Sequence, residues 1–312
     1  MKTVNGICTS AKIFTDSIEE YALAQIKMLC DNEAFRGSKI RIVPDVHPGK
    51  VGTIGFTATV GERILPNVVG IDIGCGVTIA KLKQKKIEYQ KLDAVIRDHV
   101  PSGYAVRKKA HRFKDRIDLG ELYCCRHINE SKADMSLGTL GGGNHFIEID
   151  IDDEDNKYLV IHTGSRNMGK QVADYYQNLA IQLCSGKEEM FKRKEEIIKT
   201  YKEQGRKSEI QRALKQIEVE YKQNKPDLPN ELCYLQGKYR EMYLNDMKIC
   251  QEYASLNRLQ IAKEILINYF ELTCVPEIDY PPIMSNRFET IHNYINFEDN
   301  IVRKGAIKAN KG

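Results

Sequence analysis

Glycine clusters beside metal-binding residue types are the feature that most restricts the fold of this chain. They occur in the strings VGIDIGCG, GTLGGGNHFIE and VIHTGSRNMG. Glycine tolerates left-handed backbone and close approach to a ligand, but it loses more conformational entropy on folding than other residues. Together with TIHNYINFE, these strings contain five potential ligands: Asp72, Cys75, His145, His162 and His292. One carboxylate, one thiolate and three imidazoles are enough for two metal ions if one ligand bridges them.

Each motif also has a plainer interpretation when it is taken alone. Asp72 and Cys75 are expected where a strand enters a tight glycine turn, but an isolated pair of this kind is more often a turn cap and a buried cysteine. Gly141–Gly143 could be a flexible hairpin. His162 could be a core histidine beside a surface Arg166, although a guanidinium there would also suit a phosphate clamp.

The other histidines carry weaker signals. His47, in PDVHPGK, could support the site or only a turn, and its role stays open. Three more lie in polar sequence outside the glycine-rich motifs and are expected on the surface: His99, His111 and His127.

Composition limits the class of protein without selecting one. The chain has 312 residues, 42% of them hydrophobic and 29% charged, which is typical of a globular protein with an ample core. The net charge of +4 permits an anionic partner without requiring one, since 47 basic and 43 acidic residues nearly cancel. Nine irregularly spaced cysteines, no apolar run of about 18 residues and no signal-peptide core predict a cytoplasmic protein with no membrane partner.

Three zones follow along the chain. Residues 1–185 alternate short β-branched runs with turns and a helix predicted over 16–30, which indicates a mixed α/β body. Residues 186–231 contain two apolar stripes of helical period separated by Gly205, which predicts a projecting helical hairpin. The hairpin could be an arm for RNA or a partner, although a solvated helix pair explains the pattern more simply. A long helix is predicted over 232–272, followed by a proline-rich turn.

Taken together, the motifs resemble the RtcB family of RNA-splicing ligases. The matching segments, in the family's order, are PDVHPGKVGTIGF (44–56), VGIDIGCG (69–76), GTLGGGNHFIEI (138–149), IHTGSRNMG (161–169), DMKICQEYASLNR (246–258) and IHNYINFE (291–298). The resemblance implies one RtcB-like domain over 1–312, an α/β fold with a glycine-rich core and a helical hairpin insertion at 186–231.

The resemblance also implies cofactors and site residues. Two Mn²⁺ ions would be held by Asp72 and His145 on one side and by His162 and His292 on the other, with Cys75 bridging them. GTP would contact a further set: Asn144, His145, Phe146, Ile147, Glu148, His292 and Asn293. The family transfers GMP from GTP to an enzyme histidine and then to an RNA 3′-phosphate, formed from a 2′,3′-cyclic phosphate, before a 5′-hydroxyl attacks. The expected partners are therefore GTP and RNA, either tRNA halves or broken ends.

The chain departs from the family pattern at one point. The family's guanylylated histidine lies in a His-Gly-Ala-Gly-Arg segment downstream of the HNY motif, whereas no histidine follows His292 among these residues. The catalytic residue is thus unassigned. The expected explanations are a C-terminally incomplete chain completed by a companion polypeptide, recruitment of another histidine, or a metal-binding relative without ligase activity. Two other functions remain open: a two-metal phosphoesterase and an RNA-binding pseudo-ligase.

Overall fold

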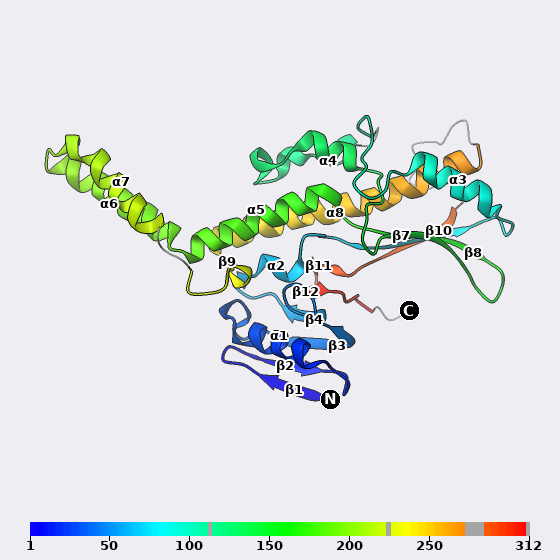
Figure 1. The fold of residues 1–312 in the computed structure, drawn as a ribbon, viewed down its shortest axis with the longest axis horizontal. Coiled ribbons are helices and arrows are strands. Elements are labelled where there is room, and N and C mark those ends of the chain that lie inside the picture. The colour runs from blue at the N-terminus through cyan, green and yellow to red at the C-terminus, as the bar shows by residue number, and fades with distance from the viewer. Residues whose placement is uncertain (112–113, 223–225, 272–283, 310–312) are drawn as a thin grey trace.

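The computed structural model describes residues 1–111, 114–222, 226–271 and 284–309, and its elements confirm a mixed α/β fold. Figure 1 shows a body of sheets crossed by one very long helix, with a helix pair extending from one end. The proline-rich turn expected near 276–282 lies outside the described residues. In the part of the chain that the structure describes, no helix combines the length and apolar character needed to cross a membrane.

Six strands of the N- and C-terminal segments form the first sheet, in the order β1-β2-β3-β4-β12-β11. The last two strands therefore complete a sheet that the first sixty residues begin, and α1 packs on it. The elements are β1 (Lys2–Asn5), β2 (Ser10–Ile13), α1 (Glu20–Asp31), β3 (Ile40–His47), β4 (Ile54–Thr59), β11 (Asn293–Asn296) and β12 (Ile301–Lys304). The helix begins at Glu20 rather than at the expected residue 16, because Glu19 before it has extended backbone geometry.

A four-stranded sheet, in the order β10-β6-β8-β7, carries the glycine motifs at its strand ends. All of its pairings are antiparallel. Residues along β6 alternate between buried and half-buried, as expected for a strand with one face on the core. The strands are β6 (Gly76–Leu82), β7 (Phe146–Ile151), β8 (Lys157–Thr163) and β10 (Met284–Ile291).

The long helix α8 (Gly237–Tyr269) joins the parts of the body. It contacts strands of both sheets and the helices α3 (Tyr89–His99) and α5 (Arg166–Cys184). Its buried residues lie all round the helix, so it runs through the interior rather than along the surface. A two-stranded sheet, β5 (Arg63–Ile64) with β9 (Leu235–Gln236), precedes it, which explains why the helix begins later than the expected residue 232.

The shorter helices differ from the sequence expectations in two places. The apolar run before Asp72 forms the helix α2 (Pro66–Val69), not a strand, because Pro66 supplies a first helical residue whose missing N–H costs nothing there. His111, expected on the surface, is buried with its Nε2 3.1 Å from Glu264 Oε1 of α8. The loop that carries His111 lies against α8, and α4 (Glu130–Ser136) follows it in the chain.

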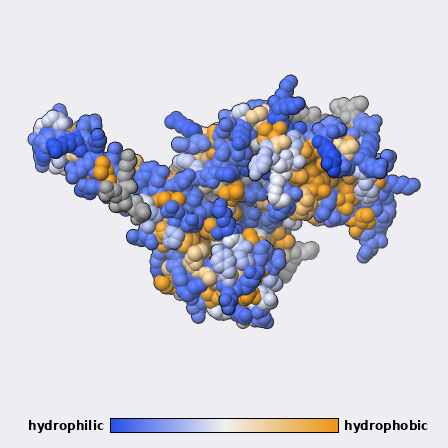
Figure 2. Space-filling model, viewed as in Figure 1, coloured by the Kyte–Doolittle hydropathy of each residue, from blue (hydrophilic) through white to orange (hydrophobic). Residues whose placement is uncertain are grey.

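Two helices project from the body (Figure 1): α6 (Lys187–Glu203) and α7 (Ile210–Lys222). They pack on each other, with Arg193–Glu220 and Lys194–Glu218 ion pairs between them at 2.9 and 2.6 Å. Figure 2 shows a largely hydrophilic surface over this hairpin. That pattern fits a solvated helix pair, and whether it also forms an arm for RNA stays a prediction.

Candidate metal centre

Asp72 and Cys75 sit in a tight turn between α2 and β6. The Cys75 backbone N–H donates to the Asp72 carbonyl at 3.2 Å, and the Gly74 N–H donates to the Asn293 carbonyl at 2.7 Å. Gly74 has φ +74°, and a Cβ there would lie 2.9 Å from the Ala254 Cβ of α8. The turn can therefore lie directly on the long helix only because residue 74 is glycine.

His145 follows the triple-glycine turn and points its ring at the same place. Its Nδ1 lies 3.0 Å from the Leu140 carbonyl oxygen, and its Nε2 lies 2.9 Å from Asp72 Oδ2. A carbonyl can only accept, so Nδ1 carries a proton, and Nε2 is the ring nitrogen that would coordinate a metal ion. This is the tautomer that an Nε2 metal ligand requires.

His162 and His292 complete the group from the other side. His162, near the end of β8, has its Nδ1 3.0 Å from the Asn144 carbonyl oxygen and its Nε2 3.3 Å from His292 Nε2. His292 lies where β10 passes into β11, and its backbone N–H donates to the Cys75 carbonyl at 2.9 Å. The chain's last ligand motif is thus tied directly to its first.

The Cys75 sulfur belongs to two donor groups at once. Its Sγ lies 3.6 Å from His145 Nε2 and 3.3 Å from His162 Nε2. The groups Asp72, Cys75, His145 and Cys75, His162, His292 each keep their ligand atoms within 4.8 Å of one another and could hold a metal ion. A mixed carboxylate, thiolate and imidazole set fits zinc as well as manganese by ligand chemistry alone.

Burial sets the charge state of these groups. It lowers the pKa of His292 to about 4, with the neighbouring His162 adding to the effect, and it lowers the pKa of His162 too, with His145 adding. Burial opposes ionisation of Asp72, but the contact with His145 outweighs it and the pKa of this carboxyl is lowered. Burial, and then the Asp72 charge, raise the pKa of the Cys75 thiol. Without metal, two imidazoles are therefore neutral, the carboxylate is charged and the thiol keeps its proton.

Two glycines make room for charged side chains at the centre. A Cβ on Gly164 would lie 2.2 Å from Asp72 Oδ1, and a Cβ on Gly141 would lie 2.0 Å from Arg166 Nη1. At these two positions the motifs therefore need glycine to leave room for a neighbouring side chain, and not only for the geometry of the turn. Gly164 lets the carboxylate reach its place, and Gly141 lets the guanidinium lie against the loop backbone.

Two polar residues of α8, which the sequence reasoning missed as site residues, hold the ligand turns together. Buried Arg258 donates from Nη1 to the carbonyl oxygens of Gly74 and Thr163 at 2.8 and 2.7 Å, and from Nε to Glu289 Oε1 at 2.7 Å. The Asn257 amide donates to the Thr139 and Gly164 carbonyls at 3.1 and 3.2 Å. The sequence contained one signal for this role, because Asn257 and Arg258 stand next to each other among the apolar residues of a long predicted helix. Buried polar groups without partners are costly, so such a pair is expected to bind something specific.

The residues expected to contact GTP divide into two groups. Asn144 and His145 line a cleft of about 660 Å³ that also reaches Asp72, and the exposed Phe146 ring lies 5.1 Å from the His162 ring. Glu148 lies on the same exposed face of β7 as Phe146, whereas the Ile147 side chain packs into a core cluster. Asn293 uses its side-chain oxygen to accept from the Gly305 N–H at 3.0 Å.

His47 is exposed on β3 with its Nδ1 3.0 Å from the Asp45 carbonyl oxygen, which fits a turn.

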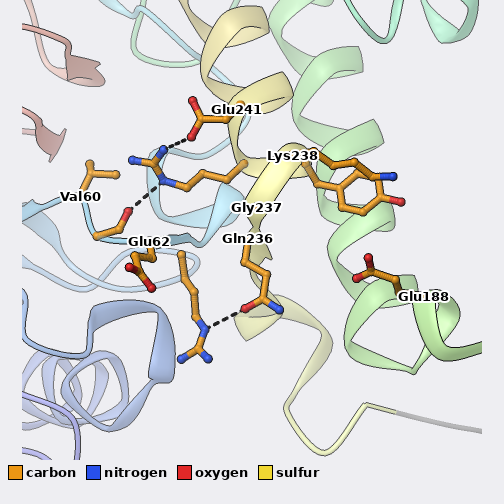
Figure 3. Close-up of a pocket in the computed structure, with 11 residues that line it drawn as sticks. Val60, Glu62, Glu188, Gln236, Gly237, Lys238 and Glu241 are labelled. Carbon is orange, nitrogen blue, oxygen red and sulfur yellow. Dashed lines mark hydrogen bonds and ion pairs between the residues drawn. The ribbon is translucent and has the colours of Figure 1, made fainter.

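A second cleft, of about 780 Å³, lies at the base of the hairpin (Figure 3). Both arginines that line it have partners: Arg63 donates to Gln236 at 3.0 Å, and Arg240 donates to the Gly61 carbonyl at 2.9 Å. None of the five ligand candidates lines it. Of these two clefts, the 660 Å³ cleft is therefore the one that reaches candidate metal ligands, Asp72 and His145.

The fold and the converging donors define a candidate two-ion centre in a glycine-rich α/β protein. The family model described as tRNA-splicing ligase RtcB matches residues 32–124 and 121–312, so the chain belongs to the RtcB family. It is 26% identical over 303 residues to the RNA-splicing ligase RtcB of Escherichia coli strain K12, which covers 88% of this chain and 65% of that protein. The tRNA-splicing ligase RtcB of Methanococcus maripaludis is 33% identical over 186 residues, covering 43% of this chain and 39% of that protein.

Proposed function

We propose that this chain binds two divalent metal ions through a shared Cys75 and takes part in RNA ligation that depends on GTP and manganese. The observation that carries the proposal is the position of the Cys75 sulfur, within 3.6 Å of one imidazole and 3.3 Å of another. The chain spans 65% of the length of the E. coli relative, so the activity of the whole protein is part of the proposal.

The residues present fit two metal ions. Asp72 and His145 would hold one ion, His162 and His292 the other, and Cys75 would bridge them. Bound cations would neutralise phosphate charge and polarise a phosphorus atom towards in-line attack. The protein's own part is orientation: the Leu140 and Asn144 carbonyls fix the tautomers of His145 and His162, and Arg258 fixes the backbone beside Cys75.

The proposed substrates are phosphate-bearing. Asn144 and Arg166 line the cleft that ends at Asp72, where their donors can contact phosphate oxygens. Phe146 and Glu148 project from the same face of β7 and would contact the guanine of GTP. RNA ends bearing a 3′-phosphate or 2′,3′-cyclic phosphate and a 5′-hydroxyl are the proposed partners. The cytoplasm is the proposed compartment, because the eight cysteines of the described residues are all unpaired.

The first test is metal stoichiometry by equilibrium dialysis with Mn²⁺ and with Zn²⁺. We expect two ions per unaltered chain, one for Asp72→Asn or His292→Ala, and a large loss of both for Cys75→Ser. His127→Ala is the control, because that ring is exposed and stacks on Tyr175 outside both donor groups. Retention of two tightly bound ions by Cys75→Ser would refute the shared-ligand arrangement.

The second test separates ligation from its alternatives. The chain is incubated with Mn²⁺, labelled GTP and RNA bearing a 2′,3′-cyclic phosphate. Since no histidine follows His292 in these residues, we expect weak or no covalent GMP on the chain alone. Strong labelling would show that another histidine serves as nucleophile. Phosphate release without GTP would favour a two-metal phosphoesterase, and RNA binding without either reaction would favour a pseudo-ligase.

A further inference from the structure

A fully exposed tyrosine stands at the mouth of the ligand cleft. Tyr104 lies in a turn after Ser102 and Gly103, and its side chain is completely solvent-accessible. Its full exposure leaves both faces of the ring free to contact a ligand that enters the cleft.

The backbone holds this tyrosine in place. The Gly103 N–H donates to the Gly141 carbonyl at 2.8 Å, and Ser102 forms a parallel bridge with Gly141. The Ala105 N–H closes the turn on the Ser102 carbonyl at 3.1 Å. Tyr104 is therefore fixed next to the triple-glycine turn that leads into His145, rather than carried on a free loop.

The cleft beside Tyr104 is cationic at its rim. Its charged lining residues are Lys132 of α4, Arg166 and Lys170 of α5, and the metal-ligand candidate Asp72. Lys170 pairs with Asp174, and Lys132 is exposed. The floor of the cleft reaches Asp72 and His145, so a strand lying along the rim would run towards the proposed ions.

We infer that Tyr104 stacks on a base of a single-stranded RNA end whose phosphates lie along Lys132 and Lys170. The inference rests on the proposed function and adds the strand-binding residues to it. A single strand is required because duplex bases already stack on one another, whereas an unpaired base offers a free face to an aromatic ring. The lysines supply the sequence-independent charge that backbone binding needs.

The test measures binding of a ten-nucleotide single-stranded RNA by fluorescence anisotropy, using the whole 312-residue chain with Mn²⁺. Tyr104→Ala should weaken binding roughly 5- to 150-fold, the range for loss of one base–aromatic stack. Tyr104→Phe should bind like the unaltered chain. Tyr21→Ala is the matched control, because Tyr21 is an exposed tyrosine of α1 that does not line the cleft.

Further readouts identify the interaction. A 2-aminopurine base in the RNA should lose fluorescence on binding to the unaltered chain and keep it with Tyr104→Ala. Lys132→Ala with Lys170→Ala should reduce the salt dependence of log K by about 1.4, or about 0.7 for each phosphate that a lysine no longer neutralises. Equal reductions in affinity for Tyr104→Phe and Tyr104→Ala would overturn stacking in favour of a hydroxyl hydrogen bond.

Failure of the inference can be told apart from failure of the proposed function. RNA binding that does not change with Tyr104→Ala would overturn the inference alone. Absence of RNA binding by the unaltered chain would overturn the inference together with the RNA part of the proposed function. In both cases the number of bound metal ions, measured on the same variants, reports separately on the metal centre.

Discussion

Gly164 is the position where one added carbon most directly tests the metal centre. A Cβ there would lie 2.2 Å from Asp72 Oδ1 and 2.6 Å from its Cγ. Gly164 lies outside the left-handed region, so alanine brings no backbone strain and the change acts only through this close approach. Ordinary contact begins near about 3.5 Å, so the carboxylate must retreat by about 1 Å.

The size of that movement predicts separate effects on fold and on metal binding. The atoms in the way are the end of a side chain, so Asp72 can rotate, and we expect a decrease in stability of about 1 kcal/mol, the lower end of overpacking penalties. Metal–ligand distances tolerate only about 0.2 Å, so the same rotation removes a ligand. Loss of a group that only orients a ligand weakens metal binding about 10- to 100-fold, so we expect one of the two ions to bind at least that much more weakly, while the ion at His162 and His292 is retained.

Calorimetric titration of Gly164→Ala with Mn²⁺, alongside urea unfolding, measures both quantities. Gly61→Ala is the matched control, because the nearest atom to its added Cβ is 4.0 Å away. Two ions bound with unchanged affinities would refute the argument that Asp72 is a ligand held in place by the missing side chain. A large decrease in stability with unchanged metal binding would show that the turn itself, rather than the carboxylate, requires glycine.

Three other predictions follow from buried charged groups and from the thiol. Arg258→Met should destabilise the chain by about 3 kcal/mol in urea unfolding, because it removes the cation that pairs with the largely buried Glu289 and leaves this carboxylate only the hydroxyls of Thr78 and Ser255. The double change with Glu289→Gln should recover part of the stability, and no recovery would contradict the ion-pair explanation. Burial raises the pKa of the Cys75 thiol, so metal binding should release its proton, and metal affinity should increase up to about tenfold per pH unit between about pH 6 and 8. Calorimetry in buffers of different ionisation heat measures the number of protons released. The same proton release from Cys75→Ser would exclude this thiol as the source. Burial lowers the pKa of the Lys304 ammonium from its ordinary value of 10.5 to about 8. Between pH 8 and about 10.5 the unfolded chain therefore keeps the Lys304 proton while the folded chain loses it. The free energy of unfolding should rise through this range, by about 3 kcal/mol in all. The unfolding free energy of Lys304→Met should lack this rise, and parallel pH profiles for the two proteins would contradict it.

Local patterns in the sequence were enough to predict the α/β class and the strands that carry His162 and follow Cys75. Apolar periodicity and glycine punctuation are local signals; the strand after Cys75 alternates between buried and half-buried residues, whereas the strand that carries His162 is buried at nearly every position. The run before Asp72 was predicted wrongly because Pro66 starts a short helix there, and so short an apolar run does not separate a strand from one helical turn. Burial of His111 was missed because it depends on Glu264, 153 residues away.

The candidate metal centre was likewise predictable only in part. The types of the five ligand candidates were visible in the sequence, whereas their distances depend on Arg258 and Asn257, which hold three separate turns from one helix. A buried guanidinium that donates to two carbonyls cannot be recognised from its neighbours in the sequence. The role of Ile147 shows the same limit, since strand register alone turns its side chain into the core.

The order of the metal donors along the polypeptide affects when metal ions can bind during synthesis on the ribosome. Asp72, Cys75 and His145 emerge early, but His162 and His292 are separated by 130 residues. At a synthesis rate of about 5–20 residues per second, roughly 6–26 s pass between the synthesis of His162 and that of His292. Asn257 and Arg258, which hold the ligand turns, are made within that interval. Until His292 has been made, the shared Cys75 sulfur can serve at most the first cation, so the second cation can be bound only after this last donor has joined the fold.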